Sequence, residues 1–231
     1  MKLAIMQPYF LPYIGYFQLI ASVDVFVIYD NIKYTKKGWI NRNRMLQNGK
    51  DVMFSLPLKS DSDYLFISQR ELSTDFKRDR FLNQITELYK KAPFFDSVLP
   101  IIRKIIQYQE NNLFLFLQYS IISICEYLEL KTSILVSSGI ALDHDLKAQN
   151  KVLSVCHALK ANTYINAIGG KELYSKEVFE AHNLELKFLS SQNFSYIQFG
   201  DTFVPWLSIL DVLMFNSKDA IQKQLWQVDF V

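Results

Sequence analysis

The stretch Met6-Gln7-Pro8-Tyr9-Phe10-Leu11-Pro12-Tyr13-Ile14-Gly15-Tyr16-Phe17 decides how we expect this chain to fold. An apolar strand is predicted just before it, over Leu3–Met6, and a helix from Gly15 to Ser22 follows a loop framed by two prolines. A second apolar strand is predicted over Asp24–Tyr29. Strand, loop, helix and strand make a βαβ unit, because two parallel strands need such a crossover. The N-terminal segment therefore predicts a parallel sheet.

The rest of the chain repeats the alternation after a middle section rich in helices. Alternating strands and helices indicate an α/β fold with a mainly parallel sheet of βαβ units. We expect one α/β domain over residues 1–231, with a helical insertion or subdomain at about 74–130. The other predicted strands are Asp51–Leu58, Ile67–Leu72, Ile134–Val136, Thr163–Ile165 and Leu184–Leu189. The other predicted helices are Thr74–Ala92, Ser97–Tyr108, Asn111–Leu128, Lys147–Leu159, Ser175–His182 and Leu207–Asn216.

The composition is that of a globular protein. Hydrophobic residues make up 50 % of the chain and charged residues 21 %, an ordinary balance. A formal charge of +2 gives no overall attraction to nucleic acid. The apolar runs are shorter than the roughly 20 residues of a membrane-spanning helix. Cys125 and Cys156 are predicted to be reduced core thiols. We expect a cytoplasmic protein with neither a transmembrane segment nor a nucleic-acid partner.

The loops that follow the first two predicted strands are where we expect the functional site. In open α/β sheets, ligands bind beyond the carboxyl ends of the strands. The Gln7–Tyr13 loop and the Asp30–Arg44 segment both lie at such ends. Asp30 ends the second strand and is a candidate general base or substrate anchor.

A basic and aromatic cluster occupies the segment after the second strand. Arginine makes bidentate contacts with phosphate, tryptophan offers a stacking face, and asparagine supplies hydrogen bonds. The cluster, taken over Trp39–Asn43, therefore suits a phosphorylated sugar or a nucleotide, although a solvated basic loop explains the lysines alone better. The binding candidates are Lys36, Trp39, Asn41, Arg42 and Asn43.

Glycines stand near several predicted strand ends. Glycine lets the backbone approach a ligand closely, and a helix N-terminus can hold phosphate. Ordinary turn chemistry explains any single glycine, and the chain contains neither a GxGxxG nor a Walker sequence. The glycines that we take as binding candidates are Gly15, Gly169 and Gly170.

The element Tyr13-Ile14-Gly15-Tyr16 occupies the place where class I nucleotidyltransferases carry a His-x-Gly-His element. Tyrosine can donate a hydrogen bond to phosphate, yet it cannot supply the positive charge of histidine. A relation to class I nucleotidyltransferase folds, with ATP as the cofactor, is left open by these four residues. Gln7, Tyr13 and Tyr16 are the binding candidates of this loop.

Asp211 lies in an otherwise apolar predicted helix near the C-terminus. A buried unpaired charge is costly, so this carboxylate needs a partner, and we expect an arginine of the N-terminal loop. Asp211 is the second catalytic candidate, and Asn216 of the same helix is a binding candidate. No spacing of cysteine and histidine indicates zinc, and we expect no metal site.

Taken together, these motifs resemble the WbqC-like protein family. The resemblance implies an enzyme of bacterial surface polysaccharide biosynthesis, of the O-antigen and lipopolysaccharide type. It implies transfer of an acyl or aminoacyl group, from a corresponding donor, to an amino sugar or a nucleotide-linked sugar. The chain departs from the family pattern at Gly139, after Ser137-Ser138, which puts the role of that loop in doubt. The resemblance rests on Gln7-Pro8, Leu11-Pro12, Ile14-Gly15-Tyr16-Phe17, Asp24, Asp30, Trp39, Asn41-Arg42-Asn43, Gly169-Gly170, Tyr174, Phe203, Pro205, Leu207-Ser208, Asp211 and Phe215-Asn216.

Three functions remain open at this point. The chain could be a transferase, an ATP-dependent activating enzyme of the nucleotidyltransferase type, or a non-catalytic sugar-nucleotide-binding protein of a glycan assembly pathway. In each, the partner is a small-molecule nucleotide-sugar or sugar phosphate. A homodimer is also left open.

Overall fold

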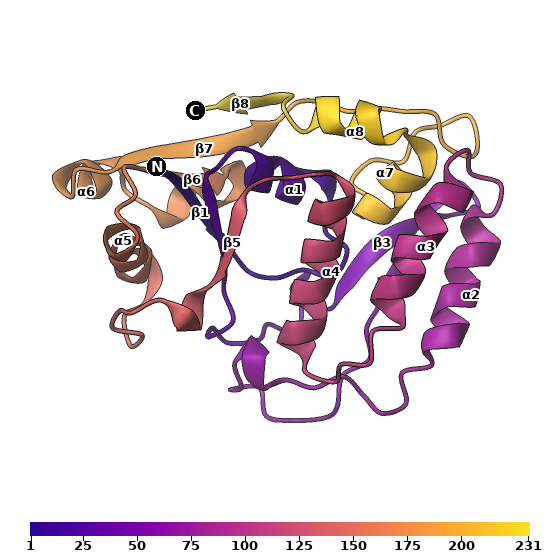
Figure 1. The fold of residues 1–231 in the computed structure, drawn as a ribbon, viewed down its shortest axis with the longest axis horizontal. Coiled ribbons are helices and arrows are strands. Elements are labelled where there is room, and N and C mark those ends of the chain that lie inside the picture. The colour runs from indigo at the N-terminus through magenta and orange to yellow at the C-terminus, as the bar shows by residue number, and fades with distance from the viewer.

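The computed structural model describes residues 1–231 and contains a six-stranded sheet with helices on both faces (Figure 1). The strand order is β5-β2-β1-β6-β7-β8, and every pair is parallel except β7 with β8. This confirms the prediction of an α/β fold with a mainly parallel sheet. The strands are β1 (Lys2–Met6), β2 (Val25–Ile28), β5 (Ser133–Val136), β6 (Thr163–Ala167), β7 (Glu185–Ser191) and β8 (Val228–Phe230).

The α-helices are α1 (Ile14–Ala21), α2 (Arg78–Tyr89), α3 (Phe95–Ile106), α4 (Leu113–Tyr127), α5 (Ala148–Ala158), α6 (Lys176–Ala181), α7 (Ile209–Phe215) and α8 (Lys218–Gln224). Short 3₁₀ helices are η1 (Ile67–Gln69), η2 (Ser137–Gly139) and η3 (Ile168–Leu173). None of the helices combines the length and the apolar character needed to cross a membrane.

Side chains that alternate along each strand enter two different apolar cores, because successive residues of a strand point to opposite faces of a sheet. In β1, Ala4 belongs to the larger core, whereas Leu3 and Ile5 belong to the smaller one. The helix α1 contributes to the larger core, and α5 and α6 contribute to the smaller one. The sheet is therefore covered on both faces, as a parallel sheet must be.

The strand order reverses between β1 and β6. From β1 the sheet grows through β2 to β5 on one side, and from β6 it grows through β7 to β8 on the other. The chain leaves β1 toward α1 on one face, and it leaves β6 toward α6 on the opposite face. Loops that diverge in this way open a crevice beyond the carboxyl ends of the two strands.

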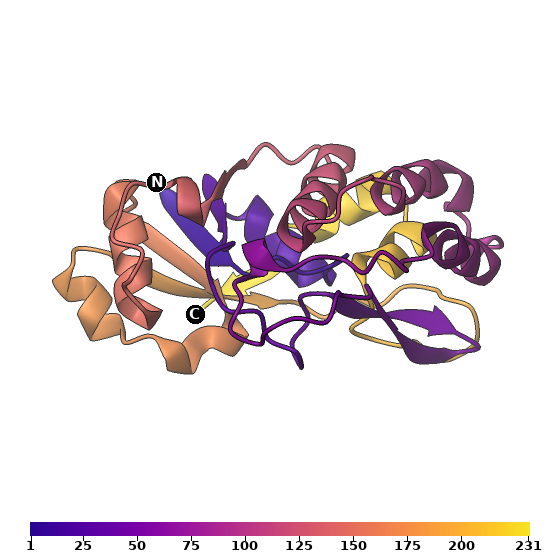
Figure 2. The same cartoon turned by 90° about the horizontal axis from the view of Figure 1, so that it is seen from below.

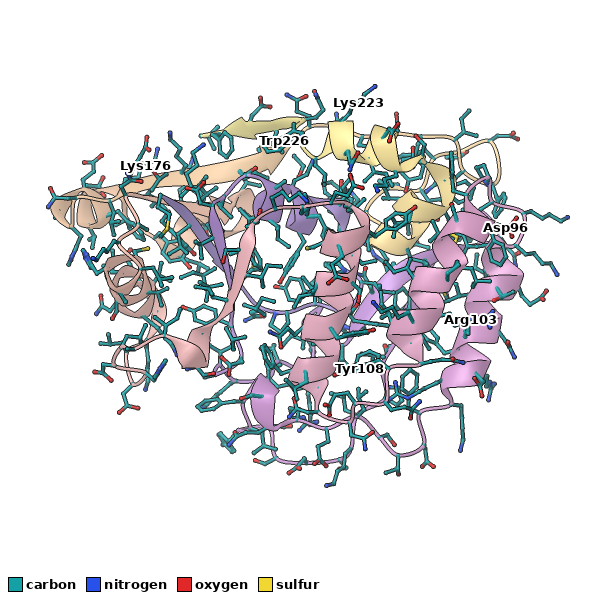
Figure 3. The ribbon with its side chains drawn as sticks, in the orientation of Figure 1. Asp96, Arg103, Tyr108, Lys176, Lys223 and Trp226 are labelled. Carbon is teal, nitrogen blue, oxygen red and sulfur yellow. The ribbon has the colours of Figure 1, made fainter.

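The helices α2, α3 and α4 stand beside the sheet and share its larger core (Figure 1). Phe26 of β2, Ile124 of α4 and Ile85 of α2 all belong to this one cluster of 47 buried residues. On the outer side of α3, Asp96 and Arg103 are exposed (Figure 3). The middle section is thus joined to the sheet by continuous apolar packing.

Two local predictions are wrong. The predicted strand Ile67–Leu72 contains the 3₁₀ helix η1, and Leu72 makes only an isolated bridge with Leu58. Conversely, residues expected in a loop form the strand β3 (Arg42–Gln47), which pairs antiparallel with β4 (Lys50–Ser55) in a hairpin outside the main sheet (Figure 2). The alternation of β3 was hidden because a buried asparagine, Asn43, occupies a position where the pattern calls for an apolar residue.

Asp211 is fully buried in α7 and accepts three hydrogen bonds. Tyr89 Oη donates to Oδ1 at 3.0 Å, while Tyr196 Oη and Gln198 Nε2 donate to Oδ2 at 2.7 and 2.6 Å. The backbone N–H of Leu46 in β3 donates to Tyr89 Oη. The expected arginine partner was therefore wrong, because hydroxyl and amide donors satisfy the carboxylate. Burial raises the pKa of Asp211, and the three donors oppose that rise.

The Asp211 cluster should control stability and its dependence on pH. Asp211→Ala should lower the free energy of unfolding by roughly 3 kcal/mol, because it leaves buried donors without an acceptor. The pKa of Asp211 is raised in the folded state. The stabilisation that this residue contributes is therefore complete below the pKa of the unfolded state, and it is lost as the pH rises through the pKa of the folded state. Urea unfolding should therefore show wild type losing stability relative to Asp211→Asn as the pH rises above about 4, the pKa of an unfolded aspartate. A difference that stays constant over this range would contradict the assignment.

Candidate functional site

A cavity of about 400 Å³ lies at the crevice between β1 and β6. Met6 lines it at the end of β1, Ala167 at the end of β6, and Leu189, Ser190 and Ser191 at the end of β7. Its size is in the range of pockets that take small ligands. We call it the switch-point cavity, since it lies where the strand order reverses.

Five of the sixteen residues that line the switch-point cavity are aromatic. Tyr9, Tyr13 and Tyr16 come from the loop after β1 and from α1, and Trp39 and Trp206 come from two distant segments. The two indoles are 42 % and 60 % exposed, so they present free faces on which a planar ligand can stack. Trp206 also has a φ of +61°, a conformation that non-glycine residues rarely adopt.

Arg44 is the only charged residue that lines the switch-point cavity. Its guanidinium lies 5.4 Å from the centre of the Trp39 ring, and its Nη1 lies 3.1 Å from Asp51 Oδ2. Its Nε is buried and has no hydrogen-bond partner. The Arg44 side chain as a whole is 30 % exposed and lines the cavity, so it can meet an anionic ligand there.

Of the two arginines in β3, we had expected Arg42 rather than Arg44 to bind the ligand. The Arg42 guanidinium instead donates to the carbonyl groups of Lys37 and Gly38, which holds the turn before β3. Residues two apart on a strand point to the same face. The alternation within β3 was therefore the signal that could have made Arg44 a binding candidate beside Arg42.

The tyrosines of the cavity are hydrogen-bond donors at neutral pH, as phenols are, and burial raises the pKa of Tyr9, Tyr13 and Tyr16 further. The Tyr16 hydroxyl donates to the carbonyl oxygen of Gln7 at 3.0 Å. Gln7 thus contributes a backbone group that fixes Tyr16. The hydroxyls of Tyr9 and Tyr13 are the phenolic donors that a ligand could use.

The proline-framed loop is fixed by buried polar side chains from other parts of the chain. Asn43 Nδ2 donates to the carbonyl groups of Phe10 and Leu11 at 3.2 and 2.8 Å. Ser208, which caps α7, donates its hydroxyl to the same Leu11 carbonyl at 2.7 Å. The backbone N–H of Ile209 donates to the carbonyl of Pro12 at 2.9 Å. The loop is therefore held in one conformation by β3 and by the start of α7.

Two of the candidate glycines are required by close approaches. A Cβ on Gly15 would lie 3.0 Å from Ser191 Oγ, so this glycine lets α1 approach the end of β7 at the cavity wall. A Cβ on Gly170 would lie 2.3 Å from Asn166 Nδ2, whereas one on Gly169 would meet nothing within 4 Å. Neither Gly169 nor Gly170 lines the cavity.

Asp30 lies beside the switch-point cavity rather than in it. It accepts hydrogen bonds from Ser137 Oγ at 2.7 Å and from the backbone N–H of Ser138 at 2.9 Å. These bonds join the end of β2 to the loop after β5. Met6, at the end of β1, lines the cavity and pairs with Ile28 of the neighbouring strand β2. Asp30 follows Ile28 by two residues, so it lies one strand away from the cavity.

The remaining candidates are engaged elsewhere. Lys36 forms an exposed ion pair with Asp63 at 2.8 Å. Asn41 accepts a hydrogen bond from the Tyr34 hydroxyl and donates one to the Leu56 carbonyl. Asn216 Nδ2 donates to the Val212 carbonyl in α7. The predicted residues that the structure brings together around the cavity are Tyr13, Gly15, Tyr16, Trp39 and Asn43. Those outside its lining are Gln7, Asp30, Lys36, Asn41, Arg42, Gly169, Gly170, Asp211 and Asn216.

Comparisons with known proteins agree with the distribution of motifs. A model of the WbqC-like protein family matches residues 7–223. The chain is also 28 % identical, over 219 residues, to a protein of Mycobacterium tuberculosis (strain ATCC 25618 / H37Rv) called "Uncharacterized protein Rv1507c". The alignment covers 93 % of each chain. That relative's name assigns no activity, so the comparison adds likeness over the whole chain but no substrate.

Asn43→Ala tests whether this buried amide holds the proline-framed loop. The variant should lose about 2 kcal/mol of unfolding free energy, because the Phe10 carbonyl and the Arg44 N–H lose their partner and the Leu11 carbonyl keeps only Ser208. Hydrogen exchange should accelerate in the loop before α1 while β6 and β7 stay protected. Asn83→Ala, on the exposed side of α2, is the matched control. A cost no larger than that of the control would show that the loop does not depend on Asn43.

Proposed function

The chain belongs to the WbqC-like protein family, and from that premise we propose that it is an enzyme of bacterial surface polysaccharide biosynthesis. In this proposal it transfers an acyl or aminoacyl group to the amino group of a nucleotide-linked sugar. The nucleotide and its phosphates occupy the switch-point cavity.

The observation that carries this proposal is the pairing of Arg44 with Trp39 in an otherwise uncharged aromatic cavity. The Arg44 side chain is 30 % exposed, and its guanidinium is the group in the lining that can pair with a phosphate. The first backbone N–H groups of α1 and the hydroxyl of Tyr13 add neutral donors on the same wall. Trp39 and Trp206 supply faces for a base or a sugar ring.

The reaction must remove one proton from the attacking amine. The amine nitrogen attacks the carbonyl carbon of an activated acyl donor, such as a thioester, and a C–N bond forms. The bond from carbonyl carbon to leaving group breaks, and the leaving group departs with the electron pair. The cavity lining contains no carboxylate, imidazole or lysine, so the proton acceptor must come from its edge. Asp30 stays our candidate for it; Asp211 is less suited, because three donors already occupy it.

An ATP-dependent activating enzyme is the second candidate function. Its support is the position of Tyr13 and Gly15, which open α1 at the cavity just after β1. Against it, the hydroxyl of Tyr16 is bound to Gln7, and neither tyrosine carries a positive charge. The transferase therefore fits the cavity better.

Arg44→Ala should weaken binding of UDP-N-acetylglucosamine, used as a probe nucleotide-sugar, by about 10- to 100-fold in calorimetry. One or two charge-assisted hydrogen bonds are worth this much. Arg103→Ala removes an equal charge from the exposed side of α3 (Figure 3) and should bind like wild type. Equal affinities for the two variants would exclude Arg44 from the phosphate site.

Transfer itself can be followed by mass spectrometry with amino-sugar nucleotides and a panel of thioester donors. Wild type should add the mass of one acyl or aminoacyl group. Asp30→Asn should slow the transfer at least about 100-fold, the usual contribution of a general base. It should leave probe binding intact, because the amide oxygen of the new side chain still accepts from Ser137. An unchanged sugar mass across the panel, with binding retained, would instead identify a non-catalytic sugar-nucleotide-binding protein.

A further inference from the structure

A second cavity, of about 370 Å³, adjoins the switch-point cavity. The two share Tyr13, Ser191 and Trp206 as lining residues. The rings of Tyr13 and Trp206 are in contact, with centroids 5.2 Å apart, and form the partition between the cavities. A ligand held against Arg44 on one side therefore has a neighbouring space on the other side of these two rings.

The lining of the second cavity differs from that of the first in carrying no charge. Its twelve lining residues include Phe194, Tyr196 and Phe203, and none of the twelve is an aspartate, glutamate, lysine, arginine or histidine. The Tyr196 hydroxyl donates to Asp211, so this tyrosine offers its ring to the cavity rather than a free donor. The polar lining groups are the amides and hydroxyls of Gln192, Asn193, Ser191 and Ser195.

The segment around the second cavity is held in place before any ligand arrives. The Gln198 side chain forms two bonds with the backbone of Val204: the Val204 N–H donates to Oε1 at 2.8 Å, and Nε2 donates to the Val204 carbonyl at 3.2 Å. The same Nε2 donates to Asp211. A preformed cavity of this kind spares the ligand the cost of ordering its site.

We propose that the second cavity receives the transferred group, and that this group is an uncharged acyl group rather than an aminoacyl group with a free ammonium. This inference rests on the proposed function and narrows it. An ammonium placed there finds no carboxylate in the lining, and Asp211, which the lining residue Tyr196 contacts, already accepts three hydrogen bonds. An alkyl chain gains from the aromatic walls, and an acyl carbonyl can accept from the amides and hydroxyls of the lining.

In the reaction, the acyl carbonyl carbon lies at the Tyr13–Trp206 partition. The sugar amine approaches it from the side of Arg44, the C–N bond forms, and the leaving group departs with the electron pair of the bond that breaks. The amine proton passes to the base. The second cavity thus holds the same acyl group before transfer and in the amide product.

Two isosteric product analogues test this charge preference directly. UDP-N-propionylglucosamine and UDP-N-glycylglucosamine differ only by CH₃ against NH₃⁺ at about pH 6.5, where an α-amino group is charged. Wild type should bind the propionyl probe at least tenfold more tightly, with UDP alone as the common reference. Trp226 lies at the junction of α8 and β8 (Figure 3) and lines neither cavity, so a Trp226→Phe background leaves Trp39 and Trp206 to report binding by fluorescence.

A carboxylate added to the lining should reduce the preference. Ser195 is exposed and lines the second cavity, so Ser195→Asp introduces a charge without disturbing the core. It should lower the propionyl preference at least fivefold and leave the affinity for UDP unchanged. Ile197→Asp is the matched control, because Ile197 is 90 % exposed and lines neither cavity. Phe203→Ala is a second variant. It should weaken binding of the propionyl probe and leave binding of the glycyl probe and of UDP unchanged.

The inference is overturned if wild type binds the two probes equally or prefers the glycyl probe, or if Ser195→Asp behaves like Ile197→Asp. Failure of the proposed function has a different signature, in which UDP does not bind wild type at all. In that case the same comparison is made with N-propionylglucosamine and N-glycylglucosamine, which carry no nucleotide. A propionyl preference that Ser195→Asp reduces would support the inference about the second cavity. The absence of such a preference would overturn that inference.

Discussion

The reversal of strand order between β1 and β6 is the constraint on which the rest of this structure depends. Because α1 and α6 cover opposite faces of the sheet, the chain must diverge at the carboxyl ends of these strands, and a crevice opens there. The proline-framed loop, the head of α1 and the end of β7 all border it. A site at this place follows from the topology, whatever chemistry its walls carry.

The walls themselves are supplied by segments that the sheet does not position. Buried polar groups position these segments. Asn43 and Ser208 donate hydrogen bonds to the loop after β1, and Asp211 accepts one from the segment after β7. Each of these groups would destabilise the core if it were unpaired. Their hydrogen bonds therefore fix the relative positions of four segments more specifically than apolar packing could.

The charge distribution around the crevice divides it into two environments. Arg44 is the only charge on the side of the switch-point cavity, and the second cavity has none. Donors on the first side are phenols, whose pKa burial raises above the ordinary value, together with the first amides of α1. The first environment therefore combines one cation with neutral donors, and the second has neutral polar groups and aromatic rings alone.

The sequence by itself determined the parallel sheet and most of the helices around it, because apolar periodicity and prolines act through neighbouring residues. Only the tertiary structure decided which polar residues line the switch-point cavity. Arg42 and Arg44 share a strand and a residue type, yet one meets backbone carbonyls and the other meets the cavity. Asp211 finds its partner Tyr89 122 residues away. Such choices depend on contacts between segments far apart in the chain, which no local pattern records.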